Sequence, residues 1–213
     1  MTYYPEAAAR FTSDTDEHRM TVVLDQGLHR HLSFRAPGTS MYWFDIVTWP
    51  GNLVIRGDMG TFAFARIDDM FDFFGAGRDV NPGYWEEKLT TGRDEAKRYD
   101  DGLYKRLVTQ HVEDHIGDSY PDEAELNVDE IQQQRAEIKA LRDAVEEELL
   151  GDYADTGHEN GAHSALQDFH HNGFEFHDTW EWDLKDWTAQ YLWCCHAIRW
   201  AISQYRAAKA EAV

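Results

Sequence analysis

Short stretches in which apolar and polar residues alternate, separated by turn residues, dominate the region between residues 28 and 66. Such stretches, rich in β-branched and aromatic side chains, are typical of β-strands. Their connections are short, which forces neighbouring strands to run antiparallel. The expected strands are Leu28–Phe34, Met41–Trp49, Leu53–Arg56 and Thr61–Arg66. We therefore predict an antiparallel meander of about four strands, one face of which is covered by helices.

Apolar residues recur at three- and four-residue spacing over three later stretches, which indicates helices. These stretches are Arg93–Ile116, Val128–Leu150 and Asp183–Ala208. For the second helix, Asn127 is a good N-cap and Gly151 a good stop. The third stretch is apolar nearly all round, so we expect it to be buried against the sheet.

These elements together predict an α+β fold. Residues 1–111 are expected to form the β-meander and the first helices, after a polar arm with one strand at Met20–Leu24. Residues 112–160 are expected to form an acidic helical appendage. Residues 161–213 supply the long, buried C-terminal helix, and we expect them to form one compact domain with residues 1–111 because no low-complexity linker separates the segments.

Composition narrows the class of protein. The 213 residues are 42% hydrophobic and 14% aromatic, which excludes a disordered chain. No apolar run reaches the roughly 18 residues of a membrane-spanning helix. The first residues, Met1-Thr-Tyr-Tyr-Pro-Glu6, lack the pattern of a secretion signal, and the adjacent pair Cys194-Cys195 makes no disulfide framework. These features favour a reducing cytoplasm as the location.

The negative charge is concentrated in one part of the sequence. The chain has a formal net charge of -20, and residues 112–160 alone hold 16 acidic and 3 basic residues. A high-salt habitat also enriches acidic residues, but it should do so along the whole surface. A dense patch of one sign selects a partner of the opposite sign, so we expect a basic protein and neither nucleic acid nor an anionic membrane.

The candidate partner-binding residues are the carboxylates of the predicted acidic helix, which we expect to project together into solvent. They are Glu130, Glu137, Asp143, Glu146, Glu147 and Glu148. An apolar stripe from Ile131 to Leu149 lies on the same helix and could pair two copies as a homodimer.

Histidines are the candidate metal ligands. His111 and His115 are four residues apart, so on a helix they share a face and could both reach zinc or manganese. The arrangement fails to match the zinc-protease motif, because Val112 occupies the place of the catalytic glutamate. His158 and His163 begin a second cluster without a recognised ligand spacing. The alternative is that these histidines pack or form hydrogen bonds without a metal, and no other cofactor is indicated.

Other nucleophile and phosphate motifs give no match. Cys194, Cys195 and His196 are neighbours on an apolar helix, where adjacent side chains do not face each other and a buried thiol is unreactive. No serine lies in a Gly-x-Ser-x-Gly elbow, and the glycines at Gly75 and Gly77 precede no lysine of a phosphate-binding loop.

Three stretches of the sequence are similar to those of a known group of proteins. They are His31–Gly60, then Asn81-Pro-Gly-Tyr-Trp-Glu-Glu-Lys-Leu89, then Phe176–Trp182 continuing to Trp193-Cys-Cys-His-Ala-Ile-Arg-Trp200. This set resembles an uncharacterised family of accessory proteins carried by tailed phages and prophages. The resemblance covers about half of the chain and leaves out the acidic segment. It implies a bacterial host cell, and it implies neither an activity nor catalytic residues.

Two functions from different classes follow from these observations. The first is a phage accessory protein that acts by binding: its carboxylates would occupy the nucleic-acid channel of a basic host defence protein, of the CRISPR or restriction type, in place of phosphates. The alternative is a metal-dependent hydrolase that acts on a nucleotide or signalling molecule through a His/Asp/Glu cluster. The clustered acids favour binding over catalysis, and a regulator of host physiology with another partner is a third reading.

Overall fold

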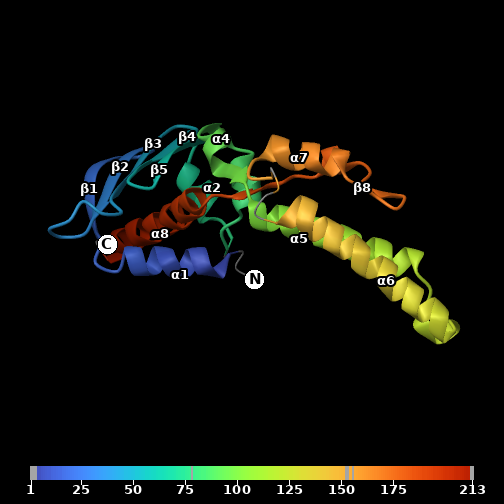
Figure 1. Ribbon diagram of the computed structural model, residues 1–213. Helices are drawn as coiled ribbons and strands as arrows, with labels where there is room; N and C mark the ends of the chain where they lie inside the picture. Colours follow the sequence, from blue (N-terminus) through green and yellow to red (C-terminus); the bar gives the residue numbers. More distant parts are fainter. Residues whose placement is uncertain (1–3, 78, 152–153, 155, 212–213) are drawn as a thin grey trace. The chain divides into compact units, whose positions relative to one another are not determined.

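The computed structural model describes residues 4–77, 79–151, 154 and 156–211 (Figure 1). The chain forms two compact units. The first, here called the sheet unit, consists of Met1–Arg98 and Trp187–Val213, and the second, the helical unit, of Tyr99–Asp186. The fold is α+β, as predicted, with an antiparallel sheet near the N-terminus and a long C-terminal helix.

The sheet unit is built on one six-stranded antiparallel sheet in which each strand pairs with the next along the chain. Its strands are β1 (Arg19–Gln26), β2 (His29–Arg35), β3 (Phe44–Trp49), β4 (Asn52–Gly57), β5 (Gly60–Ala65) and β6 (Leu89–Thr91). The predicted meander is confirmed as β2 to β5, and β1 and β6 extend it on either side.

Helices cover the apolar face of the sheet (Figure 1). They are α1 (Pro5–Asp14), α2 (Met70–Gly75), α3 (Pro82–Glu86), α4 (Arg93–Ala96) and α8 (Ala189–Glu211). Alternation along the strands supplies the core, because every second side chain faces the helices. On β2, for example, Leu32 and Phe34 are fully buried. Helix α8 lies between the sheet and α1 (Figure 1), so it is apolar on both sides.

The helix α8 is buried as predicted, but it begins six residues later than the sequence indicated. Residues Lys185–Trp187 form the short strand β10, and the Thr188 hydroxyl accepts a hydrogen bond from the backbone N–H of Tyr191 at 3.3 Å. This side-chain cap sets the start of the helix. Further along, Trp193 packs edge-on against the rings of Phe11 and Phe44, at centroid distances of 5.1 and 5.6 Å.

A partly buried ion pair joins the sheet to helix α2. Arg30 on β2 donates two hydrogen bonds to Asp69, each 2.8 Å long, and lies over the ring of Phe71. Asp69 also caps α2 by accepting a hydrogen bond from the backbone N–H of Phe71 at 2.9 Å. The hydrogen bonds from Arg30 lower the pKa of Asp69. One carboxylate therefore holds both a helix terminus and a buried guanidinium.

The helical unit is organised around two long helices. Its elements are α5 (Asp101–Ser119), η1 (Glu123–Glu125), α6 (Val128–Val145), the π-helical turn η2 (Glu146–Leu150), α7 (Glu159–Asp168), β8 (His170–His171), β9 (Phe174–Glu175) and η3 (Thr179–Glu181). The chain passes between the two units within β7 (Lys97–Tyr99) and within β10. A core of its own fills the unit, and its buried members include Val108 and Val112 of α5 and Leu141 and Val145 of α6.

Two helix predictions in this region have different outcomes. A single helix over Arg93–Ile116 is wrong, because α4 ends at Ala96 and the Asp100 side chain starts α5 afresh by accepting a hydrogen bond from the N–H of Leu103 at 2.5 Å. The helix over Val128–Leu150 is confirmed as α6 followed by η2, with Asn127 as its N-cap. The predicted acidic range 112–160 lies within the helical unit, and residues 152, 153 and 155 of it are outside the described residues.

Candidate functional site

Almost all of the net negative charge of the chain lies on the helical unit. The helical unit holds 24 acidic and 6 basic residues of the sequence, a formal net charge of -18. The sheet unit holds 16 acidic and 14 basic residues, a net charge of -2. The excess of negative charge therefore belongs to one folded unit. This unit extends beyond the acidic segment 112–160 seen in the sequence at both ends.

The six predicted partner-binding carboxylates are all exposed, but the three on α6 are engaged within the chain. Glu130 completes a capping box with Asn127, whose backbone N–H it accepts at 2.9 Å. Glu137 accepts a hydrogen bond from the Gln133 amide at 2.9 Å, and Asp143 pairs with Lys139 four residues earlier.

Helix α6 itself is close to neutral, because it carries four acidic and three basic residues. Each of its cations is paired with an acid of the helical unit. Arg142 binds Glu113 of α5 through two hydrogen bonds of 2.8 and 2.6 Å, and Arg135 binds Glu123 through two of 2.7 and 2.5 Å. The excess of acidic residues within the segment 112–160 consequently lies before and after α6 in the sequence.

The densest group of carboxylates follows α6 directly. Glu146, Glu147 and Glu148 occupy the π-helical turn η2, and all three are exposed. Within the described part of the chain, neither a hydrogen bond nor an ion pair of their side chains is found. The next residue, Leu149, is buried in the core and fixes the turn to the rest of the unit. These three carboxylates are thus held in place and left to solvent.

The four predicted metal ligands lie on two different helices. His111 and His115 share one face of α5, where both rings contact Phe174 at centroid distances of 6.3 and 4.7 Å. His158 caps α7 by accepting a hydrogen bond from the N–H of Gly161 at 2.9 Å, and His163 lies one turn further along α7. Over residues 4–77, 79–151, 154 and 156–211, no three His, Cys, Asp or Glu side chains are placed to hold a metal ion.

The His111 ring is partly buried among aromatic side chains. It lies against Phe176 and Trp182, with centroid distances of 5.1 and 5.5 Å. Burial lowers the pKa of His111, and the neighbouring His115 and His177 lower it further. The neutral imidazole is therefore the form that this environment favours.

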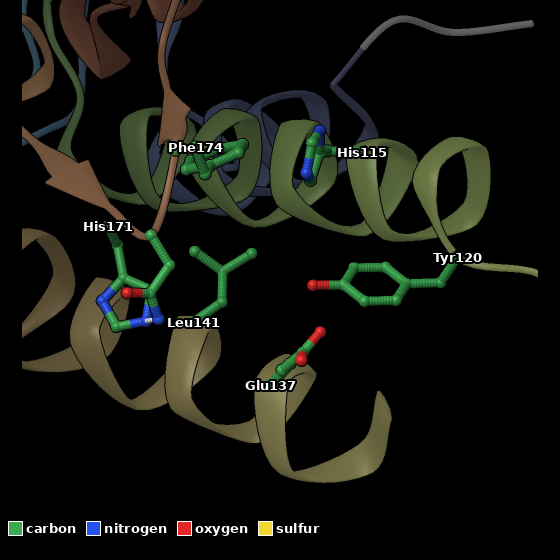
Figure 2. Close-up of a pocket in the computed structure, with 8 residues that line it drawn as sticks. His115, Tyr120, Glu137, Leu141, His171 and Phe174 are labelled. Carbon is green, nitrogen blue, oxygen red and sulfur yellow. Dashed lines mark hydrogen bonds between the residues drawn. The ribbon is translucent and has the colours of Figure 1, made fainter. Parts of the chain in front are cut away.

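A cavity of about 410 Å³ opens beside this face of α5 (Figure 2). We call it the hairpin cavity, because one wall is the turn between β8 and β9. Helix α5 and its C-cap contribute His115 and Tyr120, and α6 contributes Glu137 and Leu141; the hairpin adds His171, Asn172, Gly173 and Phe174. The volume falls in the range of small-molecule and side-chain pockets.

Each polar side chain that lines the hairpin cavity can accept a hydrogen bond, and the carboxylate of Glu137 is the one that accepts without also donating. These side chains comprise one carboxylate, two imidazole rings, a phenolic hydroxyl and an amide, and none of the residues that line the cavity is a lysine or an arginine. In Figure 2 the Tyr120 hydroxyl and the Glu137 carboxylate point toward the same part of the cavity. Sequence reasoning assigned Glu137 and His115 to two separate sites, and it did not single out Tyr120 or Phe174.

Comparison with models of known protein families, with curated proteins and with solved structures gave no significant match. Among the helices of the described residues, none is both long and apolar enough to cross a membrane.

Proposed function

We propose that this chain acts by binding and that its helical unit presents carboxylates to a basic surface of another protein. The observation that carries this proposal is the separation of charge, -18 on the helical unit against -2 on the sheet unit. A general adaptation of composition would give both units an excess of acidic over basic residues. A charge confined to one unit instead creates a local field that attracts a cationic partner and speeds its association.

The position of Glu146, Glu147 and Glu148 supports this proposal. They follow the C-terminal end of α6, where the helix dipole is negative and repels carboxylates. Neighbouring carboxylates also repel one another. Folding stability therefore gives no reason for three acids at this point, whereas binding of a basic surface does, because lysines and arginines of a partner would relieve the repulsion.

The proposed partner is a host protein whose basic channel otherwise holds nucleic acid. The carboxylates would occupy the channel in place of phosphates, as in an inhibitor of a CRISPR or restriction nuclease. The resemblance to phage accessory proteins, carried by His31–Gly60, Asn81–Leu89, Phe176–Trp182 and Trp193–Trp200, supports a setting in the cytoplasm of a bacterial host. The chain itself would contact neither nucleic acid nor membrane.

Affinity capture from a bacterial lysate tests this proposal. The expected result is a basic nucleic-acid-binding protein that is retained at low salt, released at high salt and displaced by duplex DNA. The variant E146Q/E147Q/E148Q should lose it. The control variant D16N/E17N/D94N neutralises three exposed acids of the sheet unit and should retain it. Capture that DNA does not displace, or that both variants affect equally, contradicts the proposal.

Pairing of two copies through the Ile131–Leu149 stripe remains a separate proposal. Three residues of that stripe, Leu141, Val145 and Leu149, are buried within the helical unit of the same chain. Ile131 and Ile138 are partly exposed and would have to form most of the contact. Sedimentation of the wild type and of I131S/I138S tests it, and a monomer at all concentrations contradicts it.

A metal-dependent hydrolase is the second candidate function, and one observation favours it. His111 and His115 share the face of α5 that borders the hairpin cavity, where His171 lies on the opposite wall. Zinc or manganese would be the metal. Elemental analysis of protein purified without an affinity tag, together with the thermal shift on adding either metal, tests this candidate.

A further inference from the structure

We propose that the hairpin cavity receives an arginine side chain of the basic partner. This inference rests on the proposed function and adds to it a specific site, with Glu137 as the residue that selects a cation. The lining combines a carboxylate and other groups able to accept hydrogen bonds with apolar walls, and it contains neither lysine nor arginine. A guanidinium group, which has five donors and no acceptor, is complementary to such a lining.

Glu137 supplies the negative charge of the cavity. Its Oε1 atom accepts the hydrogen bond from Gln133, and no other described residue donates to Oε2. Tyr120 lies across from it, at the C-cap of α5, with its hydroxyl directed into the cavity (Figure 2). The carboxylate and the hydroxyl can therefore accept donors from one group placed between them.

The apolar walls favour arginine over lysine. Leu141 and Phe174 lie beside the polar groups, and the Phe174 ring is held edge-to-face against His115 at 4.7 Å. A planar guanidinium is weakly hydrated and stacks on apolar and aromatic surfaces, whereas an ammonium group keeps its water more tightly.

The hairpin wall is fixed before any ligand arrives. Asn172 and Gly173 adopt positive φ angles of 48° and 88°, which is the turn geometry that suits a two-residue β-hairpin. This turn pairs His171 with Phe174, and Phe174 is anchored in the core against Phe169 and Phe176. A site that is already shaped loses less entropy when it binds.

The test uses a neutral-ended tripeptide, acetyl-Gly-Arg-Gly-amide, added to the full-length protein while NMR shifts are recorded. The lysine and citrulline versions of the peptide are the ligand controls, and ionic strength is held constant. We expect saturable shifts at His115, Tyr120 and Phe174 with the arginine peptide, weaker ones with lysine and none with citrulline. Citrulline has nearly the same shape without the charge, so equal binding of the arginine and citrulline peptides overturns the proposal.

Two variants and one matched control locate the binding. E137Q should weaken the arginine peptide about tenfold, because it removes the charge and keeps the shape. Y120F should weaken it about threefold through loss of one hydrogen bond. E125Q removes the same charge from an exposed residue outside the cavity and should leave the affinity unchanged. Equal weakening by E137Q and E125Q means that the peptide senses only overall charge, and this overturns the proposal.

The captured partner separates this inference from the proposed function. If the E137Q protein retains the partner as strongly as wild type while E146Q/E147Q/E148Q loses it, the cavity proposal is overturned and the proposed function stands. If zinc alone shifts the resonances of His115 and His171 and the arginine peptide shifts none, the cavity is a metal pocket and the proposal is also overturned.

Discussion

Arg142 on α6 donates two hydrogen bonds to the carboxylate of Glu113 on α5, from Nε to Oε1 at 2.8 Å and from Nη2 to Oε2 at 2.6 Å. This pair lowers the pKa of Glu113 and raises that of Arg142. The three basic residues of α6 are all paired with acidic residues of the helical unit. The other acidic residues of the unit therefore find no unpaired basic residue on that helix.

The Arg142–Glu113 pair should contribute little to stability. Both side chains are about half exposed, at 52% and 44%, so water screens their attraction. We expect E113Q to lower the free energy of unfolding by less than about 1 kcal/mol. A double-mutant cycle with R142Q, followed by urea unfolding, measures the coupling. A coupling of about 3 kcal/mol would instead mean that the pair behaves as a buried one.

Neutralising Glu146, Glu147 and Glu148 should stabilise the protein. Their carboxylates sit at the negative end of a helix and repel one another, at a cost of about 0.3–1 kcal/mol each at low salt. The variant E146Q/E147Q/E148Q should therefore unfold at higher urea concentration than wild type. High salt should shrink the difference, because it screens the repulsion.

A glutamine variant that is less stable than wild type at low salt would contradict this prediction. It would mean that the three glutamates make favourable contacts within the chain. The three glutamates would then contribute to folding stability, and their position would no longer support a role in binding a partner.

Replacing Asp69 should be costly. D69A removes the cap of α2 and leaves the Arg30 guanidinium, whose side chain is 10% exposed, without its carboxylate. We expect a loss of about 3 kcal/mol in the free energy of unfolding. D68A is the matched control, because Asp68 is adjacent and exposed, and it should cost less than about 0.5 kcal/mol. Equal effects of the two variants would contradict the assignment.

His111 should make stability depend on pH. Its pKa in the folded protein lies below the ordinary histidine value of 6.5, so the unfolded chain binds the proton first as the pH falls. The stabilising contribution is therefore complete above the unfolded pKa and is lost as the pH falls from 6.5 toward the lower folded value.

A histidine NMR titration measures this pKa directly, and urea unfolding over the same range measures the consequence. H111F keeps an aromatic ring against Phe176 and Trp182 and should flatten the pH dependence relative to wild type. Since burial also lowers the pKa of His196, part of the dependence should persist in the variant. A His111 that titrates above 6.5, or an unchanged pH dependence in H111F, would contradict the prediction.

The meander was predictable because its information is local. Alternation on β2 and β3 and short turns specify antiparallel pairing without reference to distant residues. The helix α1 was missed: its residues Pro5–Asp14 look polar, and they fold as a helix because Phe11 packs on α8. The start of α8 was misplaced because Leu184 and Trp187 continue the apolar spacing of the helix. In the structure Leu184 is buried in the core of the helical unit and Trp187 lies in β10.

The candidate site depended on long-range structure and was only partly predictable. The acid excess was visible in the sequence, but the unit that bears it begins at Tyr99 and ends at Asp186, and the acidic range 112–160 read from the sequence stops short of both points. The hairpin cavity draws its lining from α5, α6 and the β8–β9 turn. Of these, the Asn172-Gly173 turn had a sequence signal, and the approach of Tyr120 to Glu137 had none.

The salt dependence of binding to the captured basic partner shows whether the helical unit binds through its carboxylates. The dissociation constant is measured over a series of salt concentrations for wild type, for E146Q/E147Q/E148Q and for the control D16N/E17N/D94N. We expect the first variant to bind about tenfold more weakly at low salt and with a shallower salt dependence, because fewer charge contacts form. We expect the control to match wild type. A first variant whose affinity and salt dependence equal those of wild type would contradict the claim that the helical unit binds through these carboxylates.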